Sequence, residues 1–195
     1  MNAQERMGSD MKTALVLVDI QNDYFPGGRH ELVGPEQAAG EAARLLALFR
    51  EKGWPVFHIR HVSLHAQADF FLPDTVGAEI HASCAPHGGE AVIVKHAPDS
   101  FLGTDLKVRL DEAGVDRLVV AGMMTHMCID TTVRSAVGQG YGVDLIEDAC
   151  ATRDLQRGDV LVPAEQAQQA FLAAMSGVFA TVVKADAWIA AHAAG

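Results

Sequence analysis

Runs of β-branched and aliphatic residues recur along the chain at the length of a β-strand. The first, Thr13–Ile20, reads TALVLVDI and is almost wholly apolar, which is typical of a strand buried on both faces of a parallel sheet. Comparable runs follow at Pro55–Ile59, Ala91–Lys95, Arg117–Ala121, Tyr141–Ile146 and Val178–Val183. The pattern therefore predicts six strands.

Helical periodicity fills intervals between these runs. In Glu36–Lys52, apolar residues recur every three or four positions until Gly53, a typical helix stop. Asp105–Ala113 behaves likewise, with Thr104 as candidate N-cap and Gly114 as candidate C-cap. Strands that alternate with helices predict right-handed βαβ units. We therefore expect a Rossmann-like, three-layer α/β/α fold with a central, mostly parallel six-stranded sheet.

Two segments depart from this alternation. His61–Gly89 is rich in His, Pro, Gly and aromatic residues and has no clear period, so it predicts a long loop or lid, as long irregular connections are often functional. The alanine-rich tail, Ala185–Ala194, predicts a terminal helix, at an interface or on its own sheet. The length fits one domain, residues 1–195, of which residues 1–11 are expected to be flexible.

Charge and cysteine content narrow the class of protein. The chain carries 15 Lys and Arg against 25 Asp and Glu, a net charge of −10, which repels the phosphate backbone of nucleic acids. Its three cysteines form no C-x-x-C pair, so reduced thiols are expected. Neither a secretory signal nor an apolar run of membrane-spanning length is present. We therefore expect a cytoplasmic protein that binds neither nucleic acid nor membrane.

Three polar residues lie where apolar runs end. These are Asp19, Lys95 and, a short turn after its strand, Cys128. The carboxyl ends of parallel strands share one edge of a sheet, where active sites of such folds lie. Alone, each residue has an ordinary explanation: a turn aspartate, a solvated lysine or an inert buried thiol. Three such residues at one edge are harder to attribute to chance, and the following helix, a neighbouring cation or a neighbouring base could activate the Cys128 thiol.

Longer segments around these residues resemble the isochorismatase-like cysteine hydrolase superfamily, which includes nicotinamidases, N-carbamoyl amidohydrolases and streptothricin hydrolases. The resemblance runs from Leu15 to about Asp154. Its matching pieces are VLVDIQNDYFPGG at Val16–Gly28, VIVKHAPDSFLGTDL at Val92–Leu106, VVAGMMTHMCIDTTVRSAVGQGY at Val119–Tyr141 and DAC at Asp148–Cys150. It implies a single isochorismatase-like hydrolase domain.

Carried over by residue, the resemblance implies a catalytic triad. Cys128 would be the nucleophile, Asp19 the general base and Lys95 the supporting cation. It also implies a cis peptide bond between Met123 and Met124, and an oxyanion hole formed by the backbone N–H groups of Met124 and Cys128. The reaction would be hydrolysis of a carbon–nitrogen bond in a small amide, carbamoyl or lactam substrate through a thioester.

Two alternatives remain at this point. Vinyl-ether hydrolysis of the isochorismatase type uses the same fold and the aspartate, and is disfavoured because it does not depend on a cysteine. A non-enzymatic binding member would have an idle thiol, against which the intact Asp19, Lys95 and Cys128 argue. No G-x-S-x-G motif indicates a serine hydrolase.

Metal and cofactor motifs are weaker. His58, His61 and His65 have the spacing HxxHxxxH, and nicotinamidases bind a metal near this region through an Asp and several His. HIRHVSLH lacks that Asp, so we expect no metal. The glycine-rich GQGYG at Gly138–Gly142 precedes a strand, which indicates a turn in place of a nucleotide loop. No cofactor is expected.

The long loop His61–Gly89 and neighbouring segments are expected to form the substrate pocket. Residues expected to line or cover a pocket are Phe25, His30, Phe70, Phe71 and Phe101. The only partners that we expect are a small-molecule substrate and further copies of the chain. The resemblance implies a homo-oligomer, a dimer or tetramer.

Overall fold

The computed structural model describes residues 12–193, so the flexibility expected of residues 1–11 lies outside the described residues. The strands are β1 (Thr13–Val18), β2 (Val56–His61), β3 (Ala91–Lys95), β4 (Arg117–Met123), β5 (Gly142–Ala151), β6 (Leu155–Arg157), β7 (Val160–Val162) and β8 (Thr181–Val183). The longer helices are α1 (Pro35–Lys52), α2 (Leu106–Glu112), α3 (Asp130–Gly138), α4 (Ala164–Met175) and α5 (Ala185–His192).

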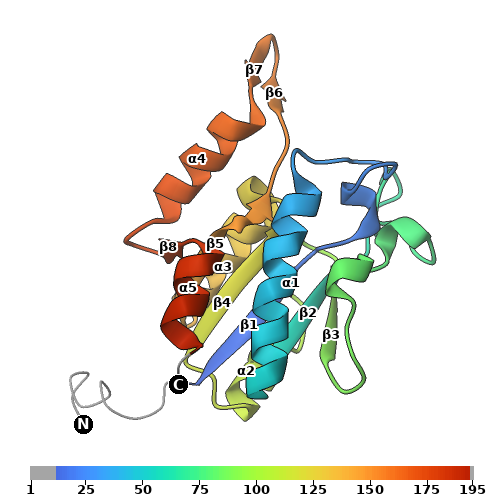
Figure 1. The fold of residues 1–195 in the computed structure, drawn as a ribbon. Helices are drawn as coiled ribbons and strands as arrows, with labels where there is room; N and C mark the ends of the chain where they lie inside the picture. The colour runs from blue at the N-terminus through green and yellow to red at the C-terminus, as the bar shows by residue number, and fades with distance from the viewer. Residues whose placement is uncertain (1–11, 194–195) are drawn as a thin grey trace.

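Six strands form one sheet in the order β3-β2-β1-β4-β5-β8 (Figure 1), and every neighbouring pair is parallel. The predicted central sheet is therefore confirmed. The chain builds β1, β2 and β3 outward in one direction and then returns to place β4 on the other side of β1. This reversal makes β1 and β4 the topological switch point, beyond whose carboxyl ends ligands bind in open α/β sheets.

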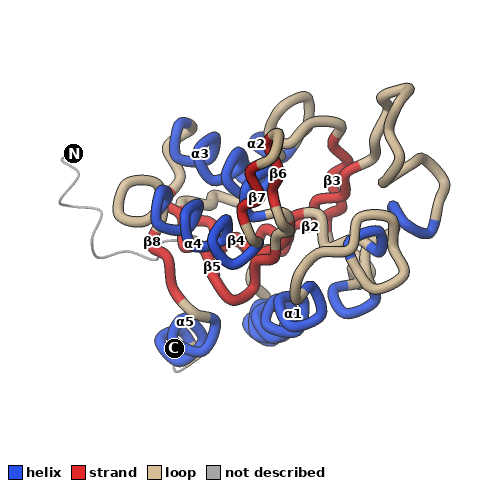
Figure 2. The backbone as a smooth tube through the Cα atoms, turned by 90° about the horizontal axis from the view of Figure 1, so that it is seen from above, coloured by secondary structure: helices blue, strands red, loops and turns tan. Residues whose placement is uncertain are grey.

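The sheet is buried on both faces, as its apolar strands predict. Along β1, Leu15 and Leu17 pack in one core cluster, whereas Ala14, Val16 and Val18 pack in the other, because successive side chains point to opposite faces. Helices α1 and α5 cover the first face (Figure 2). Helices α2, α3 and α4 contribute to the second cluster, so the molecule has the expected three layers.

Element boundaries differ from the sequence expectations by a few residues. Strand β5 runs to Ala151, five residues past the predicted end, and β8 starts at Thr181. Helix α2 begins after Asp105, one residue beyond the candidate N-cap Thr104, whose hydroxyl still accepts a hydrogen bond from the N–H of Leu106 at 3.3 Å. These shifts arise because hydrogen bonding to neighbouring elements sets where an element ends.

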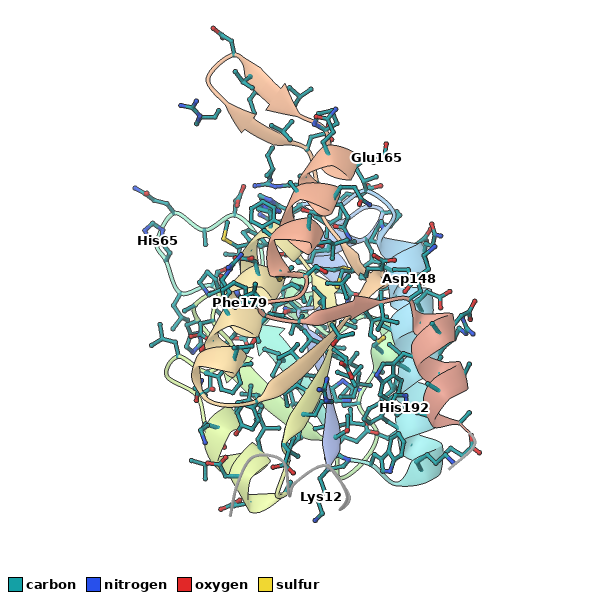
Figure 3. The ribbon with its side chains drawn as sticks, turned by 90° about the vertical axis from the view of Figure 1, so that its left-hand side faces the viewer. Lys12, His65, Asp148, Glu165, Phe179 and His192 are labelled. Carbon is teal, nitrogen blue, oxygen red and sulfur yellow. The ribbon has the colours of Figure 1, made fainter. Side chains whose placement is uncertain are left out.

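The sequence analysis missed a projecting arm formed by β6, β7 and α4. Strands β6 and β7 form an antiparallel hairpin that extends away from the sheet at the far end of α4 (Figures 1 and 3). Gly158 lies in its turn with a φ of 60°, a conformation that glycine adopts without steric cost. The side chains of Val160 and Leu161 are exposed on this hairpin.

The predicted long loop and the predicted terminal helix both correspond to observed segments. Between β2 and β3 the chain forms a long connection with two single-turn 3-10 helices, Val76–Ala78 and Ala82–Cys84, in agreement with the predicted loop. The tail forms α5, whose Trp188 stacks on Phe49 of α1 with ring centroids 5.5 Å apart. This helix therefore packs on its own sheet. Within residues 12–193, each helix is too short or too polar to cross a membrane.

Candidate active site

The three candidate catalytic residues lie together at the carboxyl edge of the sheet. Asp19 follows β1, Lys95 ends β3, and Cys128 lies in a π-helical turn, Thr125–Ile129, after β4. The Nζ atom of Lys95 is 2.9 Å from Oδ2 of Asp19. All three side chains are buried, with exposed fractions of 0 % for Asp19 and Lys95 and 3 % for Cys128. The site is therefore a desolvated thiol beside an ion pair.

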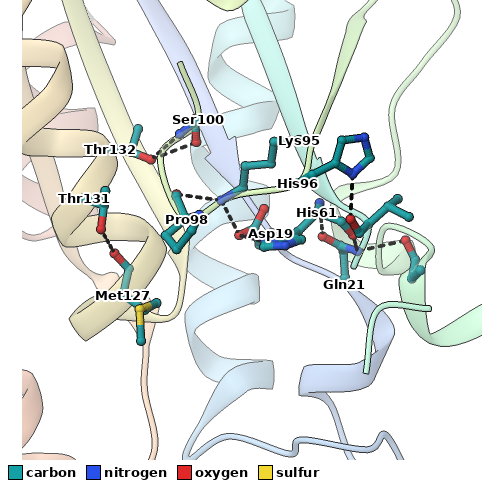
Figure 4. A network of polar contacts seen from close by, with 12 residues as sticks. Asp19, Gln21, His61, Lys95, His96, Pro98, Ser100, Met127, Thr131 and Thr132 are labelled. Atoms are coloured by element: carbon teal, nitrogen blue, oxygen red, sulfur yellow. Dashed lines mark hydrogen bonds and ion pairs between the residues drawn. The ribbon is translucent and has the colours of Figure 1, made fainter. Parts of the chain in front are cut away.

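Local backbone geometry positions these groups. Asp19 has a φ of 52°, in the left-handed region that Asp and Asn tolerate better than most residues. This conformation ends β1 and turns the chain at the switch point. Lys95 is held from its other side, where its ammonium donates a hydrogen bond to the carbonyl oxygen of Pro98 at 2.8 Å (Figure 4).

Gln21 ties three segments of the site together (Figure 4). Its fully buried amide accepts a hydrogen bond from the N–H of His61 at 2.7 Å and donates one to the carbonyl oxygen of His61 at 2.8 Å. It also donates to the carbonyl oxygen of Ala78 at 2.9 Å. These contacts hold the end of β2 and the long connection beside the end of β1.

Charge and burial determine the resting state of the thiol. Burial raises the pKa of Cys128, the charge of Asp19 raises it further, and the charge of Lys95 lowers it only in part. For Lys95, burial is the largest influence and lowers the pKa, but the charges and hydrogen bonds of Asp19 and Cys128 together outweigh it, so the net pKa is raised. The resting pair is thus a neutral thiol beside a charged lysine. This differs from the activated thiolate expected from sequence, because desolvation outweighs the nearby helix terminus.

The segment before the nucleophile connects strand to helix. The peptide bond between Met123 and Met124 is cis, as the family resemblance implies. Both methionine side chains are buried. The π-helical turn continues into α3, so Cys128 lies inside the first helical turn and not before it.

Three of the five candidate pocket residues gather around Tyr24. Phe71 lies 4.6 Å from Tyr24 and 5.9 Å from His61, measured between ring centroids. Phe70 lies 6.0 Å from Tyr24 and stacks on His30 at 4.3 Å. An aromatic cluster from the 22–30 and 70–71 segments therefore lies at this side of the site.

Phe25 and Phe101 pack elsewhere. The ring of Phe25 stacks on His81 at 3.7 Å between centroids. The ring of Phe101 stacks on Tyr141 at 6.1 Å, within the core cluster under α2 and α3. The core cluster that contains Phe101 also contains Cys128, so its pocket role stays a prediction. The connection after Lys95 folds back over the helical layer, where Ser100 hydrogen bonds to Thr132 of α3.

The three histidines of HIRHVSLH do not converge. His58 and His61 are three residues apart on β2, so they point to opposite faces of the sheet. The buried ring of His58 contacts Glu90, with Nε2 2.9 Å from Oε2. His65 is exposed, and its Nδ1 accepts a hydrogen bond from the N–H of Gln67 at 3.1 Å. This spacing therefore does not build a shared metal site.

His61 instead faces the candidate triad, which the sequence analysis did not foresee. Its Nδ1 lies 3.9 Å from Oδ2 of Asp19. Burial lowers the pKa of His61, although the charge of Asp19 opposes this shift. The ring is therefore a neutral imidazole at the edge of the site.

Further residues that sequence reasoning missed are Tyr24, Asp23 and Arg153. Burial raises the pKa of Tyr24 well above its usual value, and the charges of Cys128 and Asp19 add to this shift. Asp23 fixes the aromatic cluster, because its Oδ2 accepts a hydrogen bond from the N–H of Phe71 at 2.6 Å. Tyr24 and Asp23 lie in the sequence QNDYF, which begins two residues after Asp19, and this proximity to Asp19 in the sequence was the available signal. Arg153 reaches His30 from the chain after β5, with Nη1 3.3 Å from Nδ1.

Comparisons with known proteins agree with this architecture. The model of the Isochorismatase domain family matches residues 13–187. The isochorismatase family protein YddQ of Bacillus subtilis (strain 168) is 55% identical over 179 residues, which cover 92% of this chain and 99% of the relative. Maleamate amidohydrolase of Pseudomonas putida is 29% identical over 191 residues and covers 85% of this chain and 90% of its own. Streptothricin hydrolase of Streptomyces noursei is 36% identical over 149 residues, 73% of this chain and 50% of that protein.

Solved structures show the same fold. A putative isochorismatase hydrolase from Oleispira antarctica superposes with a TM-score of 0.90 at 49% identity, and the match covers 94% of this chain and 99% of the other. An N-carbamoylsarcosine amidase from Thermoplasma acidophilum superposes with a TM-score of 0.77 at 27% identity, over 90% and 98% of the two chains. With a family model spanning nearly the whole described chain, this protein belongs to the isochorismatase domain family.

Proposed function

We propose that this protein is a cysteine-dependent hydrolase that cleaves a carbon–nitrogen bond of a small amide, carbamoyl or lactam substrate through a thioester. The observation that carries the proposal is the contact of a buried Asp19–Lys95 ion pair with the Cys128 thiol at the switch point of the sheet. A carboxylate beside a neutral thiol can accept its proton during attack.

The first half of the reaction forms the thioester. As the Cys128 sulfur bonds to the substrate carbonyl carbon, the thiol proton passes to the Asp19 carboxylate, and the carbonyl oxygen becomes an oxyanion. The backbone N–H groups of Met124 and Cys128 are the proposed donors to this oxyanion. Asp19 then returns the proton to the leaving nitrogen, the carbon–nitrogen bond breaks, and ammonia or an amine departs.

The second half regenerates the enzyme. Water attacks the thioester carbon while Asp19 takes one of its protons, and the carbon–sulfur bond then breaks. The Cys128 sulfur recovers the proton from Asp19, and the carboxylic or carbamic acid leaves. Throughout, the Lys95 ammonium compensates the charge of Asp19, since an unpaired buried carboxylate is strongly destabilising.

Named relatives support the choice of bond. Maleamate amidohydrolase and N-carbamoylsarcosine amidase are amide-cleaving enzymes by name, and both align with most of this chain. Streptothricin hydrolase is a further hydrolase in the family. They differ in substrate, which fits a common site with variable pocket walls from the long connection between β2 and β3.

A substrate screen combined with triad variants tests this proposal. Release of ammonia is measured with nicotinamide, carbamoyl-amino acids, ureido acids and maleamate, and ring opening to the amino acid is measured with lactams. Cys128→Ala should abolish turnover, and Asp19→Asn should lower acylation by at least about 10²–10⁴-fold because general-base help is lost. The double variant Cys128→Ala/Asp19→Asn should lose no more turnover than Cys128→Ala alone, since residues that act as a unit give non-additive losses.

The control is Cys84→Ala, which removes a buried thiol whose hydrogen bonds are to the carbonyl oxygen of Ala39 and from the hydroxyl of Ser83, away from the triad. It should retain turnover. Thermal unfolding of every variant separates lost chemistry from lost folding, because removal of one partner of a buried ion pair costs about 3–5 kcal/mol. Acid quench during turnover, followed by mass spectrometry, should show the acyl group on Cys128.

The second candidate is vinyl-ether hydrolysis of the isochorismatase type, the activity after which the matching family is named. In that reaction Asp19 acts without a covalent sulfur intermediate. Substantial turnover by purified Cys128→Ala would move the assignment to this reaction. If neither amides nor vinyl ethers are turned over, but a ligand binds the intact site, the protein is a binding member of the fold.

A further inference from the structure

We propose that Asp19, His61 and Cys128 form a zinc-binding site, and that Zn²⁺ bound there holds the hydrolase in an inactive state. The inhibitory effect rests on the proposed function, whereas the binding site does not. The metal would use the candidate catalytic groups themselves as ligands.

Geometry is the first support. One carboxylate oxygen of Asp19, one ring nitrogen of His61 and the sulfur of Cys128 all lie within 4.8 Å of one another. In a tetrahedral zinc site with bonds of 2.0–2.3 Å, ligand atoms are about 3.3–3.8 Å apart. Small side-chain rotations would therefore bring the three atoms onto one ion.

The second support is a buried carboxylate with free acceptor capacity. Within residues 12–193, neither Oδ1 nor Oδ2 of Asp19 accepts a hydrogen bond of ordinary geometry, although the side chain is 0 % exposed. Lys95 forms its ion pair with Oδ2, so Oδ1 is open to a cation without breaking that pair. Buried polar atoms of this kind ordinarily have partners.

The backbone already holds His61 in place for this role. Gln21 binds both the N–H and the carbonyl oxygen of His61, at 2.7 and 2.8 Å. The imidazole Nδ1 lies 3.9 Å from Oδ2 of Asp19. Because its backbone is already fixed at the end of a strand, His61 loses little backbone freedom on binding a metal.

The donor set selects the ion. Thiolate, imidazole and carboxylate ligands suit Zn²⁺, whereas Mg²⁺ and Ca²⁺ prefer oxygen ligands alone. On binding, the S–H bond of Cys128 breaks, an S–Zn bond forms and the proton passes to the buffer, with no change of oxidation state. The sulfur then cannot attack a carbonyl carbon, and the coordinated carboxylate cannot accept its proton.

Direct binding measurements test the site without reference to activity. Full-length protein is stripped with a chelator, and Zn²⁺ is titrated by calorimetry and by competition with a chromophoric chelator. Co²⁺ serves as a spectroscopic probe, since a thiolate–cobalt bond gives a charge-transfer band. We expect one equivalent of Zn²⁺ bound and a Co²⁺–thiolate band that Cys128→Ser removes.

His61→Asn is the decisive variant. Loss of an outer-shell partner of a metal site lowers metal affinity by about 10–100-fold. Because His61 would be a direct ligand, His61→Asn should weaken zinc binding by at least this factor. His65→Asn, at the exposed histidine in the same segment, should bind zinc as the wild type does. Lys95→Met should bind at least as tightly as wild type, because a competing positive charge is removed. Unfolding curves confirm that each variant is folded.

Turnover measurements test the inhibitory effect. Chelator-stripped enzyme should be fully active, micromolar-range additions of Zn²⁺ should inhibit it reversibly, and Mg²⁺ or Ca²⁺ should not. Zinc binding unchanged in His61→Asn, or a Co²⁺ complex without a thiolate band, would overturn the site. Turnover that requires Zn²⁺ would overturn the inhibitory role. The binding measurements need no substrate, so they decide whether the zinc site exists even if no substrate is found. Failure of the proposed function can therefore be distinguished from failure of the zinc site.

Discussion

At the scale of single residues, the site depends on the balance between desolvation and charge. A thiol and an ion pair are buried together, and the pKa values of Cys128 and Lys95 are shifted by burial, by Asp19 and by each other. In the proposed mechanism, Cys128 is therefore activated by proton transfer to Asp19 during attack, in contrast to cysteine enzymes with a resting thiolate. This mechanism depends on the carboxylate more than on a low thiol pKa.

Thiol ionisation tests this balance. The pH titration of thiolate ultraviolet absorbance, measured as the difference between each variant and its Cys128→Ala counterpart, should place the Cys128 pKa above that of a free thiol. Asp19→Asn should lower this pKa because a nearby negative charge is removed, and Lys95→Met should raise it. A wild-type pKa below neutrality would show that the resting site is a thiolate, contrary to our mechanism.

At the scale of secondary structure, close approach of β1 and β4 shapes the switch point. Gly122 has a φ of 134°, and a Cβ atom there would overlap the carbonyl oxygen of Val18, the residue before Asp19. The same residue lies where the register between β4 and β5 shifts. Glycine is required here because the backbone of β1 occupies the place of a side chain.

Gly122→Ala should therefore destabilise the fold and displace Asp19. We expect a loss of about 1–3 kcal/mol from overpacking, with additional backbone strain, and a fall in turnover larger than the fall in folded fraction. Urea unfolding and ammonia release measure the two effects. The matched control is Gly40→Ala on α1, where a Cβ atom meets open space and helix propensity predicts stabilisation of about 0.5–1 kcal/mol.

Glu90 links three elements and gives a pH-dependent stability. Its carboxylate contacts Arg50 of α1 at 2.7 and 2.8 Å, the N–H of His87 at 2.8 Å and His58 of β2 at 2.9 Å. The hydrogen bonds of Arg50 are the main cause of a pKa lowered to about 2, which burial opposes and the contacts to His87 and His58 support. Because the folded-state pKa is depressed, this stabilisation is present above the unfolded-state pKa near 4.3 and is lost as the pH falls toward 2.

Glu90→Gln should thus reduce the free energy of unfolding by about 1.5–3 kcal/mol at pH 7, the contribution of hydrogen bonds to a charged group. The difference between wild type and variant should shrink as the pH falls from about 4.3 toward 2. Urea unfolding at a series of pH values measures it. Glu112→Gln, at an exposed position at the end of α2, should show no such trend. A constant difference across this pH range would contradict the assignment to ionised Glu90.

At the scale of the whole molecule, β6, β7 and α4 form an arm that extends beyond the six-stranded sheet. It extends from the body with the apolar side chains of Val160 and Leu161 exposed, at 57 % and 56 % (Figure 3). Exposed apolar side chains on a projecting element commonly mark a contact surface. We propose that the arm docks on a second copy of the chain in a homo-oligomer.

Light scattering coupled to size exclusion tests the assembly. Wild type should have the mass of a dimer or tetramer, and Val160→Asp combined with Leu161→Asp should lower this mass while thermal unfolding stays cooperative. Val178→Asp, an exposed valine in the turn before β8, is the matched control and should assemble normally. A monomeric wild-type protein, or assembly unaffected by the double variant, would rule out this role of the arm.

The sequence alone determined the fold class and the three polar strand ends, because both depend on local patterns. Apolar runs such as Thr13–Ile20 specify doubly buried strands, and parallel strands necessarily bring their carboxyl ends to one edge. Family resemblance added roles for Asp19, Lys95 and Cys128. It also covered QNDYF, in which Tyr24 was overlooked and Phe25 was preferred.

Only the tertiary structure decided which other side chains face the site and what state the thiol adopts. His61 and Phe101 come from a strand end and an irregular segment, where pairing with distant residues sets the direction of a side chain and local pattern does not. The pKa of Cys128 depends on burial, a property of the whole packed core, and this reversed the expectation from helix position. The β6–β7 arm was missed because each of its strands has only three residues, too few for a periodic signal.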